Sequence, residues 1–77
     1  MKEIYILNIY YGTHKTEVEV KDNDFFRWIY ELSEEFSITK NYRKVKDETN
    51  KRTIKAVEYY ITNYYDKKEL VGTVITV

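Results

Sequence analysis

The segment from Asp22 to Ser37 carries the pattern that most restricts how this chain can fold. Its large apolar residues recur at the three- and four-residue spacing of one helix face: Phe25, Ile29, Leu32 and Phe36, flanked by Phe26 and Trp28. The other face is charged, with Arg27, Glu31, Glu34 and Glu35. At its start, Asp22, Asn23 and Asp24 offer N-cap oxygens. The pattern predicts one amphipathic helix that supplies half of a core.

The residues before this helix have the two-residue period of a β-hairpin. Residues 3–11 are apolar on both faces, which is typical of a strand in the interior of a sheet. A turn is predicted at Gly12–Lys15. Thr16, Val18 and Val20 then alternate with charged residues, so they are expected to point inward.

Residues 52–65 allow two interpretations. Ile54, Val57, Ile61 and Tyr64 lie on one helical stripe, yet the same segment is rich in β-branched and aromatic residues. Cross-strand pairing favours a strand. A turn at Thr49–Asn50 would place Asp47 opposite Arg52 and Val45 opposite Ile54.

A second turn, at Lys67–Lys68, would place Tyr65 opposite Leu70 and Thr62 opposite Thr73. Leu70–Val77 is a strand on either interpretation. The sequence therefore predicts one α+β domain over residues 1–77, a small mostly antiparallel sheet with one helix packed across it. The expected order is ββαβββ, with ββααβ as the alternative. No repeat or linker divides the chain.

Charge is unevenly distributed although the net charge is zero. Residues 1–39 carry four basic side chains against eight acidic ones, and residues 40–55 carry seven basic side chains against two acidic ones. A neutral total argues against a general polyanion binder, while polarised charge can orient a partner. A local nucleic-acid site is an alternative, with Arg43, Lys44, Lys46 and Arg52 as its candidate residues.

The sequence contains no catalytic motif. His14 is the only histidine and is expected in a turn, and Ser33 and Ser37 lack the glycines of a nucleophile elbow. Nothing matches a phosphate-binding loop, a zinc-protease helix or a calcium-binding loop. We therefore expect no enzyme, no cofactor and no metal. The absence of cysteine fits a reducing compartment, and no apolar run has the length of a membrane span, so a cytoplasmic protein is expected.

The unusual feature is the aromatic content, which includes nine tyrosines. Three pairs are adjacent: Tyr10-Tyr11, Tyr59-Tyr60 and Tyr64-Tyr65. In a strand, neighbours point to opposite faces, so each pair is expected to send one ring away from the helix. Tyrosine is enriched at interface hot spots because it combines contact area with a hydroxyl group.

These observations lead to the hypothesis of a small non-catalytic protein-binding module. Its expected partner-binding residues are Tyr10, Tyr11, Tyr59, Tyr60, Tyr64, Tyr65, Lys67 and Lys68. The residue usage fits an AT-rich gene, so a phage- or mobile-element-encoded inhibitor that covers a surface of a host or defence protein is the specific version. The alternatives are a single-stranded nucleic-acid binder and a self-assembling structural subunit, for example a homodimer.

Overall fold

A computed structural model describes residues 2–49 and 51–77. It contains β1 (Glu3–Tyr11), β2 (His14–Val20), α1 (Asp22–Ser33), β3 (Ser37–Asp47), β4 (Arg52–Thr62) and β5 (Lys68–Thr76). The predicted α+β class and the order ββαβββ are confirmed. Residues 52–62 form a strand, which excludes the alternative with a second helix in this segment.

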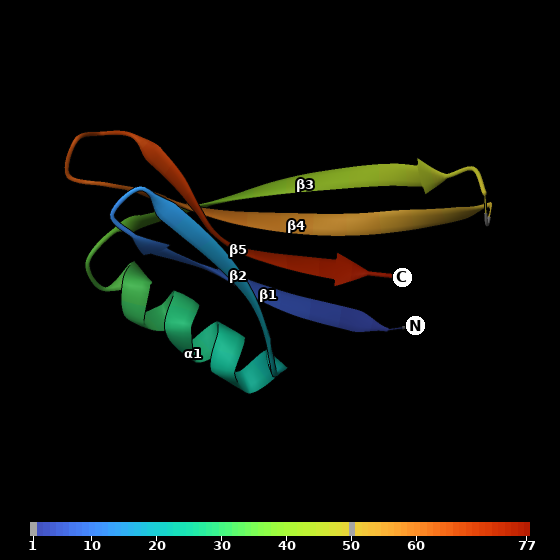
Figure 1. Cartoon of the computed structure of the whole chain (residues 1–77), viewed down its shortest axis with the longest axis horizontal. Helices are drawn as coiled ribbons and strands as arrows, with labels where there is room; N and C mark the ends of the chain where they lie inside the picture. The colour runs from blue at the N-terminus through green and yellow to red at the C-terminus, as the bar shows by residue number, and fades with distance from the viewer. Residues whose placement is uncertain (1, 50) are drawn as a thin grey trace.

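The strands form one antiparallel sheet in the order β2-β1-β5-β4-β3 (Figure 1). β5 is central, and β2 and β3 are the two edges. Since α1 follows one edge strand and precedes the other, it carries the chain across one face of the sheet. The outer part of the β3–β4 hairpin extends beyond the helix, so the molecule is elongated, with extents of 41 × 24 × 22 Å.

The register of β3 and β4 agrees with the prediction. Asp47 pairs with Arg52, Val45 with Ile54, and Lys44 with Lys55. Of the turn predicted at Thr49–Asn50, Asn50 lies outside the described residues. The two predicted pairs are thus present in the strand ladder, and the same register sets Lys44 opposite Lys55, an unfavourable like-charge pair.

The predicted turn between β4 and β5 is wrong. Thr62 pairs with Lys68 and Tyr60 with Leu70, and the register shifts by one between Tyr59 and Tyr60. The chain reverses earlier than expected because the side chain of Asn63 closes the turn, as described below. A β-bulge in β5 then absorbs the extra residue.

Two smaller predictions at element ends are also wrong. The first turn is only Gly12–Thr13, since His14 already pairs with Tyr11, and Gly12 has the positive φ of 60° that such a tight turn uses. The N-cap of α1 is Lys21, which makes no side-chain cap bond. Asp22 instead lies inside the first turn, where an acidic side chain favours the positive end of the helix dipole.

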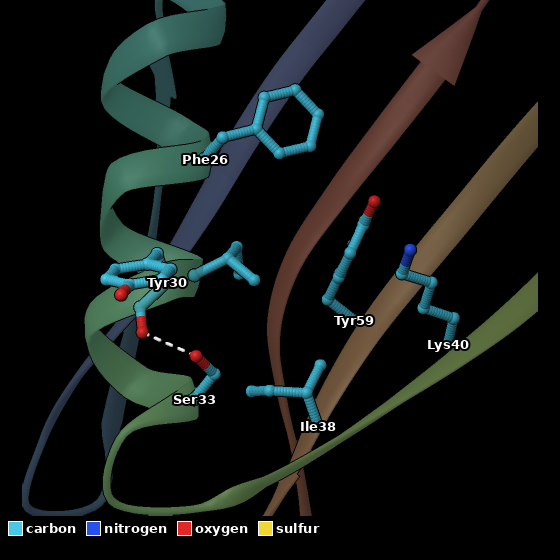
Figure 2. A pocket seen from close by; sticks show the side chains of 7 residues that line it. Phe26, Tyr30, Ser33, Ile38, Lys40 and Tyr59 are labelled. Atoms are coloured by element: carbon cyan, nitrogen blue, oxygen red, sulfur yellow. Dashed lines mark hydrogen bonds between the residues drawn. The ribbon is translucent and has the colours of Figure 1, made fainter.

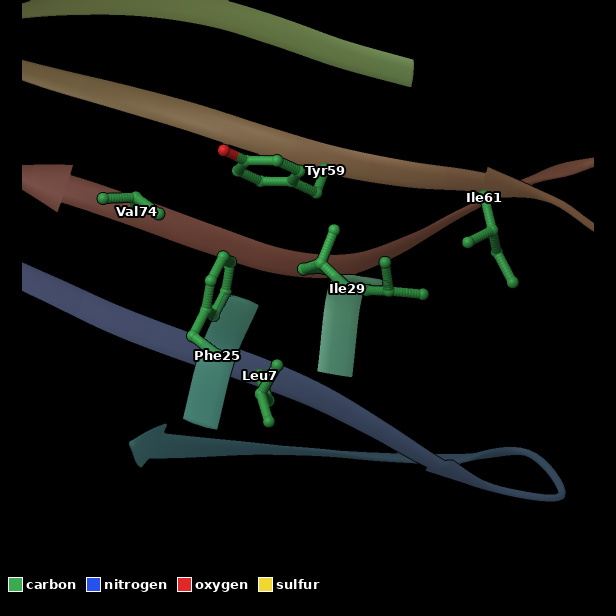
Figure 3. Close-up of a cluster of buried hydrophobic side chains, with 7 residues drawn as sticks. Leu7, Phe25, Ile29, Tyr59, Ile61 and Val74 are labelled. Carbon is green, nitrogen blue, oxygen red and sulfur yellow. The ribbon is translucent and has the colours of Figure 1, made fainter. Parts of the chain in front are cut away.

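The core lies between α1 and the middle of the sheet (Figure 3). Phe25 is fully buried, and its ring meets those of Tyr5, Phe26 and Tyr59 at centroid distances of 5.3–5.5 Å. Ile29 packs beside it, as the helical stripe predicts, whereas Phe36, the fourth residue of that stripe, lies beyond the helix end at Ser33 and still packs against the core. The residues that complete the buried cluster are Leu7, Ile61, Val71 and Val74.

Asn8 is a polar residue inside this otherwise apolar architecture. It follows Leu7 in β1, so it points to the sheet face away from α1. Its side chain is 4% exposed, and neither its oxygen nor its nitrogen has a hydrogen-bond partner among the described residues. A buried amide without a partner costs free energy relative to an apolar group of the same shape.

Replacing Asn8 by leucine is therefore expected to raise the free energy of unfolding by about 1–2 kcal/mol. Urea denaturation followed by circular dichroism measures this change. Asn63→Leu is the matched control, because the Asn63 amide is bonded and its loss should lower stability. A lower stability for Asn8→Leu would show that the Asn8 amide contributes a favourable interaction in solution.

Candidate functional site: a tyrosine-rich end

Three connections of the chain lie at one end of the molecule. They are the β1–β2 turn, the α1–β3 connection and the β4–β5 turn, all at the left of Figure 1. The predicted partner residues Tyr10, Tyr11, Tyr64, Tyr65, Lys67 and Lys68 belong to this end, and we refer to them as the tyrosine-rich end. Residues more than fifty positions apart in the sequence are gathered there because β1 pairs with β5.

Asn63 organises the β4–β5 turn. Its Oδ1 accepts hydrogen bonds from the backbone N–H groups of Tyr65 at 2.9 Å and Lys67 at 3.0 Å. Its own backbone N–H donates to the Lys67 carbonyl at 2.8 Å, and its Nδ2 donates to Glu69 Oε1 at 3.1 Å. Asp66 takes the left-handed conformation that the turn requires, with a φ of 62°. The turn therefore has a fixed backbone that presents two tyrosines.

Tyr64 is held in place although its side chain is exposed. Its ring packs against Phe36 with a centroid distance of 5.1 Å, and its hydroxyl donates to the carboxylate of Glu35. This hydrogen bond raises the pKa of Tyr64, because the carboxylate favours the protonated phenol. Tyr65, at 84% exposure, has no such side-chain contact within the described residues. The Tyr64 ring is thus held by contacts within the chain, whereas the exposed Tyr65 ring is free to contact a partner.

Tyr10 and Tyr11 differ in the same way, since Tyr10 is hydrogen-bonded within the chain and Tyr11 is exposed. The Tyr10 hydroxyl donates to the Leu70 carbonyl at 2.6 Å, which joins β1 to β5 beyond the last ladder pair, Leu7 with Gly72. Burial raises the pKa of Tyr10, with a further contribution from the charge of Glu69. Tyr11 is widely exposed beside the turn. Tyr10 therefore supports the end, and Tyr11 is part of its surface.

The third tyrosine pair lies in a different environment. Tyr59 is 7% exposed and packs edge-on against Phe25, so it belongs to the core. Tyr60, its neighbour in β4, is half-buried on the opposite face of the sheet. The expected alternation of rings is present, but the inward ring is covered by the helix. Of the tyrosines proposed from the sequence, Tyr11, Tyr64 and Tyr65 are the most accessible.

The four residues suggested for nucleic-acid binding do not share a face. Lys44 and Lys46 point to the helix side of the sheet, whereas Arg43 and Arg52 point to the other side. Arg43 lies 3.9 Å from the carboxylate of Glu58, and Arg52 pairs in register with Asp47. Half of the predicted set therefore lies beside acidic residues and away from the other half.

His14 and Ser33 are among the residues that were considered as possible catalytic groups. His14 is exposed at the first position of β2, and Ser33 donates its hydroxyl to the Tyr30 carbonyl at 2.6 Å. Within residues 2–49 and 51–77, no three histidine, aspartate or glutamate side chains are grouped closely enough to hold a metal ion. The arrangement at the tyrosine-rich end is suited to contact and hydrogen bonding.

Sequence reasoning missed the role of Asn63 in ordering the β4–β5 turn. The signal was available, because asparagine favours turns in which its side-chain oxygen accepts from backbone N–H groups further along the chain. The uncharged, β-rich residues around it instead favoured extension of the strand by three positions.

Comparisons with known proteins add no relative. No protein-family model matches this chain, and neither the curated proteins nor the solved structures searched contain a match. In the part of the chain that the structure describes, no helix combines the length and apolar character needed to cross a membrane.

Proposed function

We propose that this chain is a small non-catalytic protein-binding module whose tyrosine-rich end docks on a larger partner protein. The observation that carries the proposal is the exposure of Tyr11, Tyr64 and Tyr65 at one end, on turns with defined backbones. An isolated exposed aromatic residue is common, but several together typify a contact surface. Because the Asn63 turn is already ordered, little entropy is lost when the partner orders Tyr65.

The mode of action that we propose is occlusion. The tyrosine-rich end is a small surface, and covering a functional surface of the partner requires no catalytic group. Lys67 and Lys68 lie between Asp66 and Glu69, and these charges orient the partner surface. With the AT-rich residue usage, this supports an inhibitor encoded by a phage or mobile element, directed against a host or defence protein.

The test compares exposed tyrosines of the tyrosine-rich end with an exposed aromatic residue of α1. Tagged wild-type protein is used to capture its partner from a nuclease-treated lysate, and dissociation constants are then measured for single variants. Tyr65→Ser and Tyr11→Ser should weaken binding by at least about thirtyfold, the effect of a hot-spot residue. Trp28→Ser is the control, since Trp28 is a partly exposed aromatic residue of α1 that lies outside the tyrosine-rich end.

Circular dichroism establishes that each variant is folded before binding is compared. Full binding by the folded variants Tyr11→Ser and Tyr65→Ser would contradict the proposal. Capture from an untreated lysate that is lost after nuclease treatment would contradict it as well.

A further inference from the structure

The β3–β4 hairpin separates its charges between the two faces of the sheet. Alternation places the lysine side chains of residues 38–46 and 53–61 on the helix side, around the exposed ring of Tyr42. We call these five residues the lysine strip: Lys40, Tyr42, Lys44, Lys46 and Lys55. Within the same two ranges the only acidic residue is Glu58, which points to the opposite face. The strip is therefore a purely basic surface in a protein of zero net charge.

An open apolar groove of about 310 Å³ lies at the inner end of this strip (Figure 2). Phe26 and Tyr30 of α1 form one wall, and Ile38 and Tyr59 form the other. Lys40 stands at the junction of groove and strip, with its Nζ 5.5 Å from the centroid of the Tyr59 ring. The groove is large enough for one or two apolar side chains, and the ammonium group of Lys40 lies at one side of it.

The same groove and strip border a free sheet edge. Within the described residues β3 pairs with β4 alone, so the N–H and C=O groups on its outer side have no strand partner there. An extended segment that pairs with β3 would continue the alternation of the sheet. Its side chains on the helix side would lie beside Ile38, Lys40 and Lys44 in turn.

We propose that β3 is a docking edge for an extended segment of a partner protein, with apolar and then acidic side chains on one face. The apolar side chains enter the groove between Tyr30 and Ile38, and the acidic ones lie along the lysine strip. This surface is separate from the tyrosine-rich end and is independent of the function proposed for it.

Charge complementarity selects this occupant over a second copy of the chain. Two β3 edges side by side would bring one lysine strip against another, which is how lysines on edge strands suppress self-pairing. An acidic segment is attracted by the same lysines, so the lysine strip disfavours pairing with a second copy of the chain and favours an acidic partner. The other edge, β2, carries Glu17 and Glu19, and the apolar groove lies on the β3 side of the sheet.

A peptide is also favoured over nucleic acid. Tyr42 is the only exposed ring within the strip, which provides one stacking site where a single strand needs several. The groove adjoining it has an apolar lining, which suits leucine or isoleucine side chains. The unpaired N–H and C=O groups of β3 can form hydrogen bonds with another peptide backbone.

The probe is a synthetic, end-blocked, fluorescent peptide, Leu-Thr-Leu-Thr-Glu-Thr-Glu-Thr-Glu. Its reversed sequence is included, because a strand can join an edge in either direction. The control peptide, Leu-Glu-Leu-Glu-Thr-Glu-Thr-Thr-Thr, has the same composition but places acids and leucines on opposite faces. Fluorescence anisotropy gives the affinities, and amide hydrogen exchange of the protein reports strand pairing.

We expect one of the two designed peptides to bind at least about tenfold more tightly than the control peptide. Binding should slow exchange at alternate amides of β3, those that point away from β4. Lys44→Gln should weaken binding about fivefold to tenfold, whereas Arg43→Gln, the adjacent residue on the opposite face, should change it less than about twofold. Lys44→Gln is expected to fold, because it removes a like-charge pair with Lys55.

Tyr65→Ser should bind the peptide as the wild type does, so failure here is distinguishable from failure of the proposed function. Equal binding of designed and control peptides would overturn the inference, as would equal losses from Lys44→Gln and Arg43→Gln. Unprotected β3 amides in the complex would overturn it too. Tighter binding of single-stranded oligothymidine than of any peptide would identify the strip as a nucleic-acid surface instead.

Discussion

Replacing Phe25 by alanine is expected to lower the free energy of unfolding by about 3–5 kcal/mol. Phe25 has no exposed surface, and its ring contacts the rings of Tyr5, Phe26 and Tyr59. Truncation removes these contacts and leaves a cavity between helix and sheet. A domain of this length has a total stability on the order of 4–12 kcal/mol, so the variant should be marginally folded or unfolded at 37 °C.

Urea denaturation monitored by circular dichroism measures this loss, and Phe26→Ala is its matched control. Phe26 is the next residue of α1 but remains 46% exposed. Its truncation removes less buried area and is expected to cost under half as much. Equal losses for the two variants would show that the helix is not oriented with Phe25 toward the sheet.

The second large effect is expected at Gly72, which lies in the central strand directly beneath Phe25. A Cβ at this position would lie 2.6 Å from Phe25 Cε2 and 2.8 Å from Cζ. Real Cβ atoms do not approach ring carbons so closely, so either the ring or the helix must move. Gly72→Ala is therefore expected to cost about 3 kcal/mol through overpacking, even though alanine is otherwise suited to a strand better than glycine.

A double-mutant cycle tests this cause. Phe25→Leu lacks the ring atoms that the new Cβ would meet, so Gly72→Ala should cost much less in the Phe25→Leu background. The two substitutions should show a coupling energy of about 1–3 kcal/mol. Additive losses would mean that the alanine acts through something other than the ring, and the close approach of helix and sheet would need another explanation.

The parts of the fold that the sequence predicted are those set by strong local periodicity. The stripe of Phe25, Ile29 and Leu32 identified the buried face of α1, and the complementary pair Asp47 with Arg52 fixed the β3–β4 register. The β4–β5 turn was mispredicted because its position depends on the side chain of one residue, Asn63. Several pairings of the apolar residues around it were similarly favourable, so cross-strand propensity alone could not decide between them.

The candidate site was predicted in its residue type but not in its location. Alternation correctly separated Tyr59 from Tyr60, but it could not tell which ring α1 would cover. The placement of Tyr11 at the same end as the turn that carries Tyr65 required the pairing of β1 with β5, a long-range contact that no local pattern contains. The lysine strip was within reach of the sequence. Once residues 52–62 are assigned to a strand that pairs with the segment containing Arg43 and Lys44, the alternation of side chains alone places these two residues on opposite faces.

The central position of β5 also determines when the protein can fold. Gly72 and Val74, against which Phe25 packs, lie in the third strand after α1, and this strand, β5, joins the β1–β2 hairpin to the β3–β4 hairpin. During synthesis, α1 therefore emerges long before the strand that covers its apolar face. Folding is governed by contacts of high sequence separation, which are slow to form. The two hairpins become one cooperative unit only when the last strand enters between them.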